Sequence, residues 1–391
     1  MPNIVARPRK GDRPDRPTTW RLTWELPLGS DGNRRRVRET FRGGKKEAVE
    51  HWTKRQAEIS AQGKNYTPPS TQSVAEYLDH WLRTYVAVHL RPSTADSYTR
   101  LVRLHILPHL SQIPLADLTP QILQAWVADL SAKPSRAGHP LSPRTVSYAR
   151  SILRDALAEA VRLGMLPTNP IDRVRPPKQQ PKVVQSFTLD QVRALDRAGR
   201  EQRLGPLFSF LWHTGLRIGE AIALRWEDVD LAAATLVVRR NLVEVSGRLV
   251  ASTPKTAAGT REIALMTQTV DLLQRHLASQ GVERLIHGAS WNPDGLVFPS
   301  LAGTPLTRRN VTRSWAALRT AVGLPPYGLH ALRHTAASLQ LQAGVGVREI
   351  AATLGHENPG FTARIYAHVL EATKRQAAEK FSRLLGDDSS E

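Results

Sequence analysis

The sequence contains no cysteine among its 391 residues. This absence excludes disulfides, thiolate metal ligands and a cysteine nucleophile, and it fits a reducing cytoplasm. No apolar run is long enough to span a bilayer, and residues 1–14 are basic without the apolar stretch of a signal peptide. We therefore expect a soluble cytoplasmic protein that has no membrane partner.

Acidic residues are few relative to basic ones. The chain has 54 lysines and arginines against 35 aspartates and glutamates, which gives a formal net charge of +19. Such an excess indicates a polyanionic partner, of which nucleic acid is the usual one. A merely soluble basic protein is the alternative. An acidic membrane surface is less well supported, because no basic amphipathic segment with a strong apolar face is found.

The chain is too long for a single ordinary hydrophobic core. Two proline-rich stretches, residues 67–70 and 173–186, have the composition of exposed linkers. They predict three segments: 1–66, 73–172 and 187–391. The periodicities described below predict a multidomain α+β protein that is mainly α with small β-sheets.

The first segment is predicted to be a small sheet followed by a helix. Tryptophan and leucine alternate on one face over residues 20–26, residues 30–33 have hairpin-turn chemistry, and residues 37–41 can return as a second strand. A helix is expected over residues 45–60. Four arginines crowd the turn and the second strand: Arg34, Arg35, Arg36 and Arg38. A solvated charge run is the alternative, but on a small sheet of a basic protein they favour binding in a nucleic-acid groove.

The second segment is predicted to be a bundle of four helices. Thr119-Pro120 and Ser142-Pro143 each combine an N-cap residue with proline at the first helical position. Aromatic residues at helical spacing are expected in the core rather than stacked on bases. Basic and hydroxyl residues near the helix starts can either bind phosphates or serve only as caps, and the pattern does not decide between the two. They are Arg91, Ser93, Thr94, Arg144 and Thr145.

The third segment is predicted to mix helices with short strands. Helices are expected near residues 188–200 and 206–213, and strands at residues 236–241, 248–252 and 262–265, with mostly helix elsewhere. Four stretches carry residues with possible chemistry. They are Thr-Gly-Leu-Arg217, Thr-Pro-Lys255-Thr, His330-Ala-Leu-Arg333-His334, and Leu-Gly-His356 followed by Tyr366.

Helical geometry predicts which of these residues lie on the same face of a helix. His330 and Arg333 are three residues apart, so they share a helix face and can grip one anion together. His334 also lies one turn from His330, so spacing alone does not choose between the two histidines. Asn358 before a proline is a helix start. Tyr366 then falls at the edge of the apolar stripe of this helix, which allows a buried ring and a reachable hydroxyl.

Each of these residues has an ordinary explanation when it is taken alone. Arg217 can pair with Glu220 one turn later, and a lone histidine or tyrosine usually packs. All the motifs together, in this order, resemble the tyrosine recombinase family of the phage-integrase kind. The resemblance covers the third segment as a catalytic domain. It makes the second segment similar to a core-site DNA-binding domain and the first similar to an arm-type DNA-binding domain.

The resemblance implies that a phosphodiester is held by positive side chains. Arg217 and Arg333 clamp its non-bridging oxygens, on which charge gathers in the transition state, and His356 adds a further donor. Tyr366 attacks phosphorus and forms a 3′-phosphotyrosyl link. The link conserves the bond energy, and the arginines supply the charge that a metal would otherwise provide, so no cofactor, ATP or metal is expected.

Two proton transfers follow from the same resemblance. A free tyrosine has a pKa of about 10, so Tyr366 needs a base or positive surroundings near neutral pH. His330 is expected to help remove its proton, and Lys255 to protonate the departing 5′ oxygen as a general acid.

The expected function is site-specific recombination that integrates and excises a phage or other mobile element. The expected partners are double-stranded attachment sites, a homotetramer on DNA, and a directionality factor or a host DNA-bending factor, all in the bacterial cytoplasm or nucleoid. The alternatives are strand relaxation like that of a type IB topoisomerase and a catalytically silent DNA-binding regulator. The apolar pattern after Tyr366 predicts a tail helix, which can pack within its own chain or on a neighbouring protomer.

Overall fold

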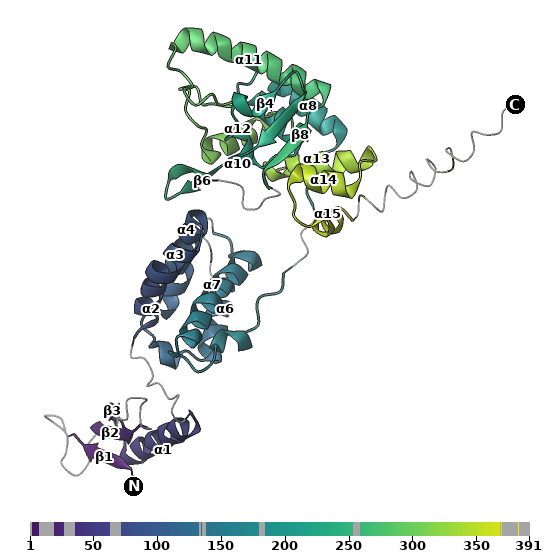
Figure 1. The fold of residues 1–391 in the computed structure, drawn as a ribbon. Coiled ribbons are helices and arrows are strands. Elements are labelled where there is room, and N and C mark those ends of the chain that lie inside the picture. Colours follow the sequence, from purple (N-terminus) through teal and green to yellow (C-terminus); the bar gives the residue numbers. More distant parts are fainter. Residues whose placement is uncertain are drawn as a thin grey trace. The chain divides into compact units, whose positions relative to one another are not determined.

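The computed structural model describes residues 2–7, 19–26, 36–62, 72–132, 134, 138–179, 184–252, 259–367, 369 and 382. The chain divides into two compact units, residues 1–179 and 180–391, each of which is described by itself (Figure 1). No helix within the described ranges is long and apolar enough to cross a membrane.

The N-terminal sheet is antiparallel, with strand order β1-β2-β3. It consists of β1 (Asn3–Ala6), β2 (Thr19–Glu25) and β3 (Arg36–Arg42), and it is followed by α1 (Lys45–Gln62). Trp20, Leu22 and Trp24 are buried in a small cluster to which α1 contributes Ala48 and Ile59. The predicted strand pair and helix are confirmed. Strand β1 was not predicted, because its four residues are too few for a periodic signal.

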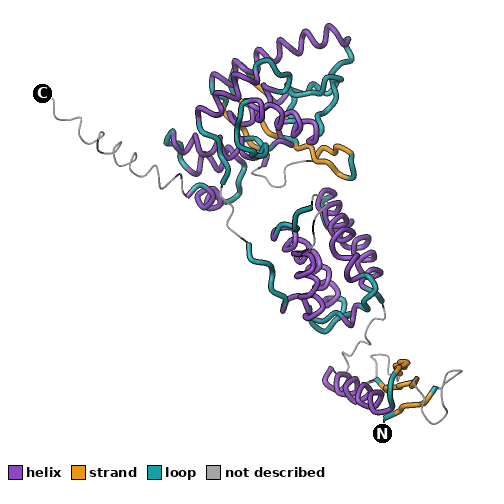
Figure 2. The backbone as a smooth tube through the Cα atoms, turned by 180° about the vertical axis from the view of Figure 1, so that it is seen from behind, coloured by secondary structure: helices purple, strands orange, loops and turns teal. Residues whose placement is uncertain are grey.

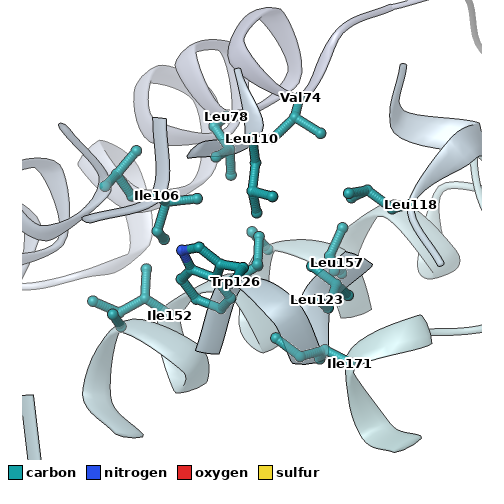
Figure 3. Close-up of a cluster of buried hydrophobic side chains, with 14 of the residues drawn as sticks. Val74, Leu78, Ile106, Leu110, Leu118, Leu123, Trp126, Ile152, Leu157 and Ile171 are labelled. Atoms are coloured by element: carbon teal, nitrogen blue, oxygen red, sulfur yellow. The ribbon is translucent and has the colours of Figure 1, made fainter. Parts of the chain in front are cut away.

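A helical bundle follows, and its core is shown in Figure 3. The two predicted helix starts are confirmed by their caps: the Thr119 hydroxyl accepts from the Ile122 amide, and the Ser142 hydroxyl accepts from the Thr145 amide. Trp126 lies in the core and donates its indole N–H to the His105 carbonyl at 2.9 Å. The helices are α2 (Val74–Trp81), α3 (Ala87–His89), α4 (Pro92–Leu101), α5 (Leu107–Leu110), α6 (Pro120–Ala132) and α7 (Pro143–Arg162), with π-helical turns at Leu82–Val86 and Val102–Ile106.

The second unit is built around the buried helix α9 (Gly205–Thr214), which packs against α8 (Leu189–Gly199) and α13 (His330–Gln342). The remaining helices are α10 (Ile218–Ala221), α11 (Thr267–His287), α12 (Arg308–Ala321), α14 (Val347–Leu354) and α15 (Pro359–Ile365). Along the chain, α13, α14 and α15 follow one another and are packed in that order (Figure 1).

The strands of the second unit form two separate small sheets, drawn in orange in Figure 2. One sheet has the order β4-β5-β8, from Val229–Asp230, Thr235–Val238 and Arg261–Ala264, and the other is the hairpin of β6 (Asn241–Val245) and β7 (Arg248–Ser252). The strand predicted over residues 236–241 is confirmed over residues 236–238 and wrong beyond them. Strand β5 ends at Val238, residues 239 and 240 belong to neither strand, and Arg240 binds Asp228 at 2.6 Å.

The three-domain division remains a prediction. The first compact unit includes both the sheet and the bundle, although the two have separate hydrophobic clusters. Both predicted linkers lie partly outside the described residues, since residues 63–71 and 180–183 are not among them.

Candidate active site

Arg217 is placed by the turn that ends α9. Gly215 has a left-handed φ of 68°, and a Cβ there would come within 2.7 Å of the Leu354 side chain, so only glycine fits. Arg217 then caps the start of α10. Its backbone N and its Nη1 each donate to the Glu220 carboxylate at 2.9 Å, so the pairing suggested by the sequence is present. The Arg217 side chain is still 42% exposed, and its open side can meet a ligand.

Glu220 is a buried carboxylate at the start of α10, only 4% exposed. Besides Arg217, it accepts from Arg261 on β8, whose Nη2 lies 3.0 Å from Oε2. Burial alone would raise the pKa of Glu220, but the hydrogen bond and charge of Arg261, together with Arg217, lower that pKa below its usual value. Glu220 is therefore an anion that holds two arginines.

Arg333 lies one turn into α13 and is 3% exposed. Its Nη1 donates to the Gly215 carbonyl at 2.8 Å, and its Nη2 donates to the Leu354 carbonyl at 2.7 Å and to Nε2 of His356 at 2.9 Å. Burial, followed by the positive charge of Arg217, lowers the pKa of Arg333 to about 9. Burial and the charge of Arg217 thus both disfavour the charged form of Arg333, and an anionic ligand would stabilise that form.

His356 follows the left-handed Gly355 that ends α14. Arginine is only a donor, so Nε2 of His356 accepts from Arg333 and the ring is neutral. The proton then lies on Nδ1, which donates to the Thr362 hydroxyl at 2.7 Å. Burial, followed by the charges of Arg333 and Arg217, lowers the pKa of His356 to about 4.

The lowered pKa of His356 predicts that acid destabilises the protein. The unfolded chain takes up this proton near pH 6.5 and the folded chain only near pH 4, so stability present above pH 6.5 is lost as the pH falls towards 4. We expect His356→Gln to remove on the order of 1 kcal/mol of the acid-induced loss, measured by urea unfolding at pH 7 and pH 4.5. The same change at the exposed His287 is the control. An unchanged pH dependence in His356→Gln would contradict the assignment.

Tyr366 ends α15 as its C-cap and is 1% exposed. Its hydroxyl bonds to Nδ1 of His334 at 2.8 Å. Burial raises the pKa of Tyr366 to about 12, although the charge of Arg333 opposes this. The ring is buried as predicted, but the hydroxyl is occupied by His334. The His330 ring packs edge-on against the His334 ring, with centroids 4.6 Å apart.

Two family models match the chain. The model described as "Phage integrase family" matches residues 185–373, and "Phage integrase, N-terminal SAM-like domain" matches residues 73–131. This chain belongs to the phage integrase family. It is accordingly an enzyme for site-specific DNA recombination of the tyrosine type, and the resemblance found in the sequence motifs is confirmed.

Individual relatives agree with this integrase membership. The chain is 25% identical to a tyrosine recombinase XerC-like protein of Caldanaerobacter subterraneus subsp. tengcongensis, over 92% of this chain and 95% of that protein. It is 26% identical to an integrase of Mycobacterium phage D29, over 82% and 83%. A solved Tn1549 transposon integrase in complex with a circular intermediate DNA matches with a TM-score of 0.66 at 22% identity, covering 80% of this chain and 99% of that one. The predicted fold class is confirmed.

The structure of this integrase brings together five of the six residues predicted to be catalytic. Arg333 joins His356 directly, and the Arg217 side chain reaches the same turn, with Nη2 3.5 Å from the Gly355 carbonyl. Tyr366 lies near enough to Arg333 for that charge to lower its pKa, and its hydroxyl bonds to His334, whose ring contacts the His330 ring. The sixth residue, Lys255, lies outside the described residues.

The predicted DNA-binding residues lie in the first compact unit. Arg36 and Arg38 are on the exposed face of β3, where Arg36 pairs with Glu25 at 2.9 Å. Arg34 and Arg35 lie outside the described residues. At the start of α7, the Thr145 amide donates to the Ser142 hydroxyl in the helix cap, and phosphate binding there stays a prediction. Four other candidates lie at helix starts: Arg91, Ser93 and Thr94 at α4, and Arg144, which is exposed, at α7.

Two residues of this integrase site were not predicted from the sequence. His334 stands in the motif His-Ala-Leu-Arg-His, but helical spacing did not distinguish it from His330. Arg261 was missed entirely. The signal that could have found it is the period-two burial of β8, in which Arg261 and Ile263 share the inward face.

Proposed function

We propose that Tyr366 is the nucleophile that cuts and rejoins DNA in this recombinase. The observation that supports the proposal is the cluster of Arg217, Arg333 and His356 at one turn, with Tyr366 held next to Arg333's helix by His334. Such a cluster suits a phosphodiester, because guanidinium groups bind its non-bridging oxygens with short, charge-assisted hydrogen bonds.

The proposed reaction is a balanced transesterification. The Tyr366 oxygen bonds to phosphorus, the bond from phosphorus to the 5′ oxygen breaks, and a 3′-phosphotyrosyl link and a free 5′ hydroxyl result. The tyrosine gives up its proton, and the 5′ oxygen receives one from Lys255. Attack by the 5′ hydroxyl of another strand reverses the step and rejoins the DNA, so neither ATP nor a metal enters the balance.

The described arrangement is the resting form of the proposed site. The Tyr366 hydroxyl is buried and bound by His334, and Nη2 of Arg333 donates to Nε2 of His356. A phosphate that enters the site must replace His356 as the acceptor of the hydrogen bond from Arg333. Its negative charge also favours protonation of His356, and a protonated His356 donates to the phosphate. The tyrosine must also move towards phosphorus.

We propose His334 as the first acceptor of the Tyr366 proton, with His330 supporting it through the ring contact. His334→Ala is expected to slow cleavage near neutral pH by about 100-fold and to shift the rate profile towards higher pH, where the tyrosine ionises without help. His330→Ala is the comparison variant, and we expect a smaller loss. If only His330→Ala shows the pH shift, the original assignment of the base to His330 stands and this one fails.

The proposed substrates and assembly follow from relatives of the same fold. A solved lambda integrase tetramer bound to a Holliday junction matches with a TM-score of 0.57 at 18% identity, over 93% of this chain and 94% of that one. We propose that this protein likewise acts as a tetramer on two double-stranded attachment sites of a mobile element, in the cytoplasm or nucleoid. A directionality or DNA-bending factor remains a prediction, and so does the tail helix, whose packing in cis or in trans stays open because most of its residues lie outside the described ranges.

The decisive experiment uses duplex DNA that spans the junctions of the element carrying this gene. One strand is nicked beside the cleavage position, so that the short product leaves and the covalent adduct is trapped. Purified protein in EDTA and without ATP should give a protease-sensitive adduct on a denaturing gel. If the junction DNA is bound without an adduct, the silent regulator is correct. Relaxation of supercoiled DNA that lacks the site would instead favour the topoisomerase-like activity.

A further inference from the structure

Three arginines from three different elements bind consecutive carbonyls at the end of α14. Arg261 on β8 donates from Nε to the Thr353 carbonyl at 2.6 Å. Arg333 on α13 donates to the next carbonyl, that of Leu354, at 2.7 Å, and Arg217 at the start of α10 reaches the one after it, that of Gly355, at 3.5 Å. The turn that carries His356 is therefore the point at which the positive groups of the site meet.

The physical reason is the unsatisfied C-terminus of this helix. The last carbonyls of an α-helix have no partner within it, and they carry the negative end of the helix dipole. The backbone amides of Gly355 and His356 bond back to the carbonyls of Ala352 and Ala351, each at 2.9 Å. The three carbonyls that follow are left for side chains, and positive side chains are favoured there.

Arg261 differs from Arg333, which is also buried and hydrogen-bonded, in that its charge is already paired with a carboxylate. It is 9% exposed, and in addition to Thr353 it donates to both oxygens of Glu220 and to the Gly259 carbonyl, at 3.0 to 3.4 Å. The Arg217 side chain is by contrast 42% exposed. Arg261 is therefore already satisfied within the protein, and a phosphate is left to Arg217 and Arg333.

We propose that Arg261 is a positioning residue of the recombination site. Through Glu220 it fixes the start of α10, which carries Arg217, and through Thr353 it fixes the turn that carries His356. The proposal rests on the function proposed above. A misplacement of about 1 Å in a site of this kind costs about 100-fold in rate. The contacts of Arg261 with Glu220 and Thr353 therefore affect the chemical step rather than DNA binding.

The test is Arg261→Lys, because an ammonium keeps the charge but cannot span Glu220 and Thr353 at once. We expect adduct formation on the nicked junction duplex to slow by about 100-fold, with DNA affinity changed by less than about threefold. Arg203→Lys is the matched control. Arg203 makes the same kind of contacts away from the site, to the Glu283 carboxylate and the carbonyls of Pro299 and Ser300.

A double-mutant cycle with Arg217→Lys separates positioning from a general loss of structure. Because Arg261 acts partly through Arg217, Arg261→Lys should slow the adduct clearly less in the Arg217→Lys background than in the wild type, since residues that act as a unit are not additive. Fully additive losses, or equal losses in Arg203→Lys, would overturn the proposal. If Arg261→Lys does not fold, it is replaced by the double variant Glu220→Gln, Arg261→Gln, in which the buried pair is uncharged. The expected and the contradicting results stay the same. A wild-type protein that forms no adduct would instead refute the proposed function itself.

Discussion

Replacing Tyr366 with phenylalanine is expected to abolish covalent attachment to DNA, with a loss of at least about 10⁴-fold, while binding to the junction duplex is retained. The variant removes the nucleophilic oxygen, and no other group can form the phosphotyrosyl bond. The ring packs in the cluster of Ile350 and Leu354, where phenylalanine fits equally well. The lost hydrogen bond to His334 should cost only about 1 kcal/mol of folding stability. The measurement is adduct yield on the nicked duplex beside a gel-shift titration.

Tyr327→Phe is the matched control for this prediction. Tyr327 is a partly buried tyrosine of the same unit that packs against Phe187 and has no role in the proposed chemistry. It should form adduct at the wild-type rate. An adduct that persists in Tyr366→Phe would mean that another residue attacks phosphorus. Loss of both adduct and binding would mean that the variant has not folded, which thermal unfolding would show.

Local sequence signals were enough to predict most helices, and the motifs led to five residues that lie near one another in the described structure. N-cap residues followed by proline marked the starts of α6, α7 and α15, because these caps act on their own helix and need no tertiary contact. The motifs proposed to be catalytic were recognisable for a related reason. A glycine that must be left-handed precedes Arg217 and another precedes His356, so the chemistry is tied to turns that short stretches of sequence encode.

The features that the sequence did not predict depend on tertiary contacts. Helical spacing placed His330 and His334 one turn apart, but only the packing of α15 shows that His334 meets the Tyr366 hydroxyl. Arg261 is distant in sequence from Thr353, and although the alternation of β8 can place Arg261 on the inward face, it does not show that Arg261 binds the end of a helix. The break between β5 and β6 arises from the pairing of Arg240 with Asp228, which a strand propensity does not contain.

Replacing Arg333 with glutamine is expected to slow adduct formation by about 10³- to 10⁵-fold, the range typical of an arginine that stabilises phosphoryl charge. The reason is already present in the free protein. Burial and the charge of Arg217 lower the pKa of Arg333 to about 9, so its positive charge is poorly compensated until an anion arrives. A phosphate that gains charge in the transition state makes up for this most strongly at the moment of reaction. Single-turnover rates on the nicked duplex measure the loss.

The sharpest version of this experiment changes the substrate along with the enzyme. A junction duplex whose scissile phosphate has a methyl group in place of one non-bridging oxygen is neutral, so it needs less positive charge at the site. The loss caused by Arg333→Gln should therefore be much smaller on this substrate than on ordinary DNA. Arg319→Gln, which removes a half-buried arginine bound to the Tyr327 carbonyl, should behave like wild type on both. An equal loss on the two substrates would show that Arg333 acts by holding Gly215 and Leu354 in place rather than by neutralising the phosphate.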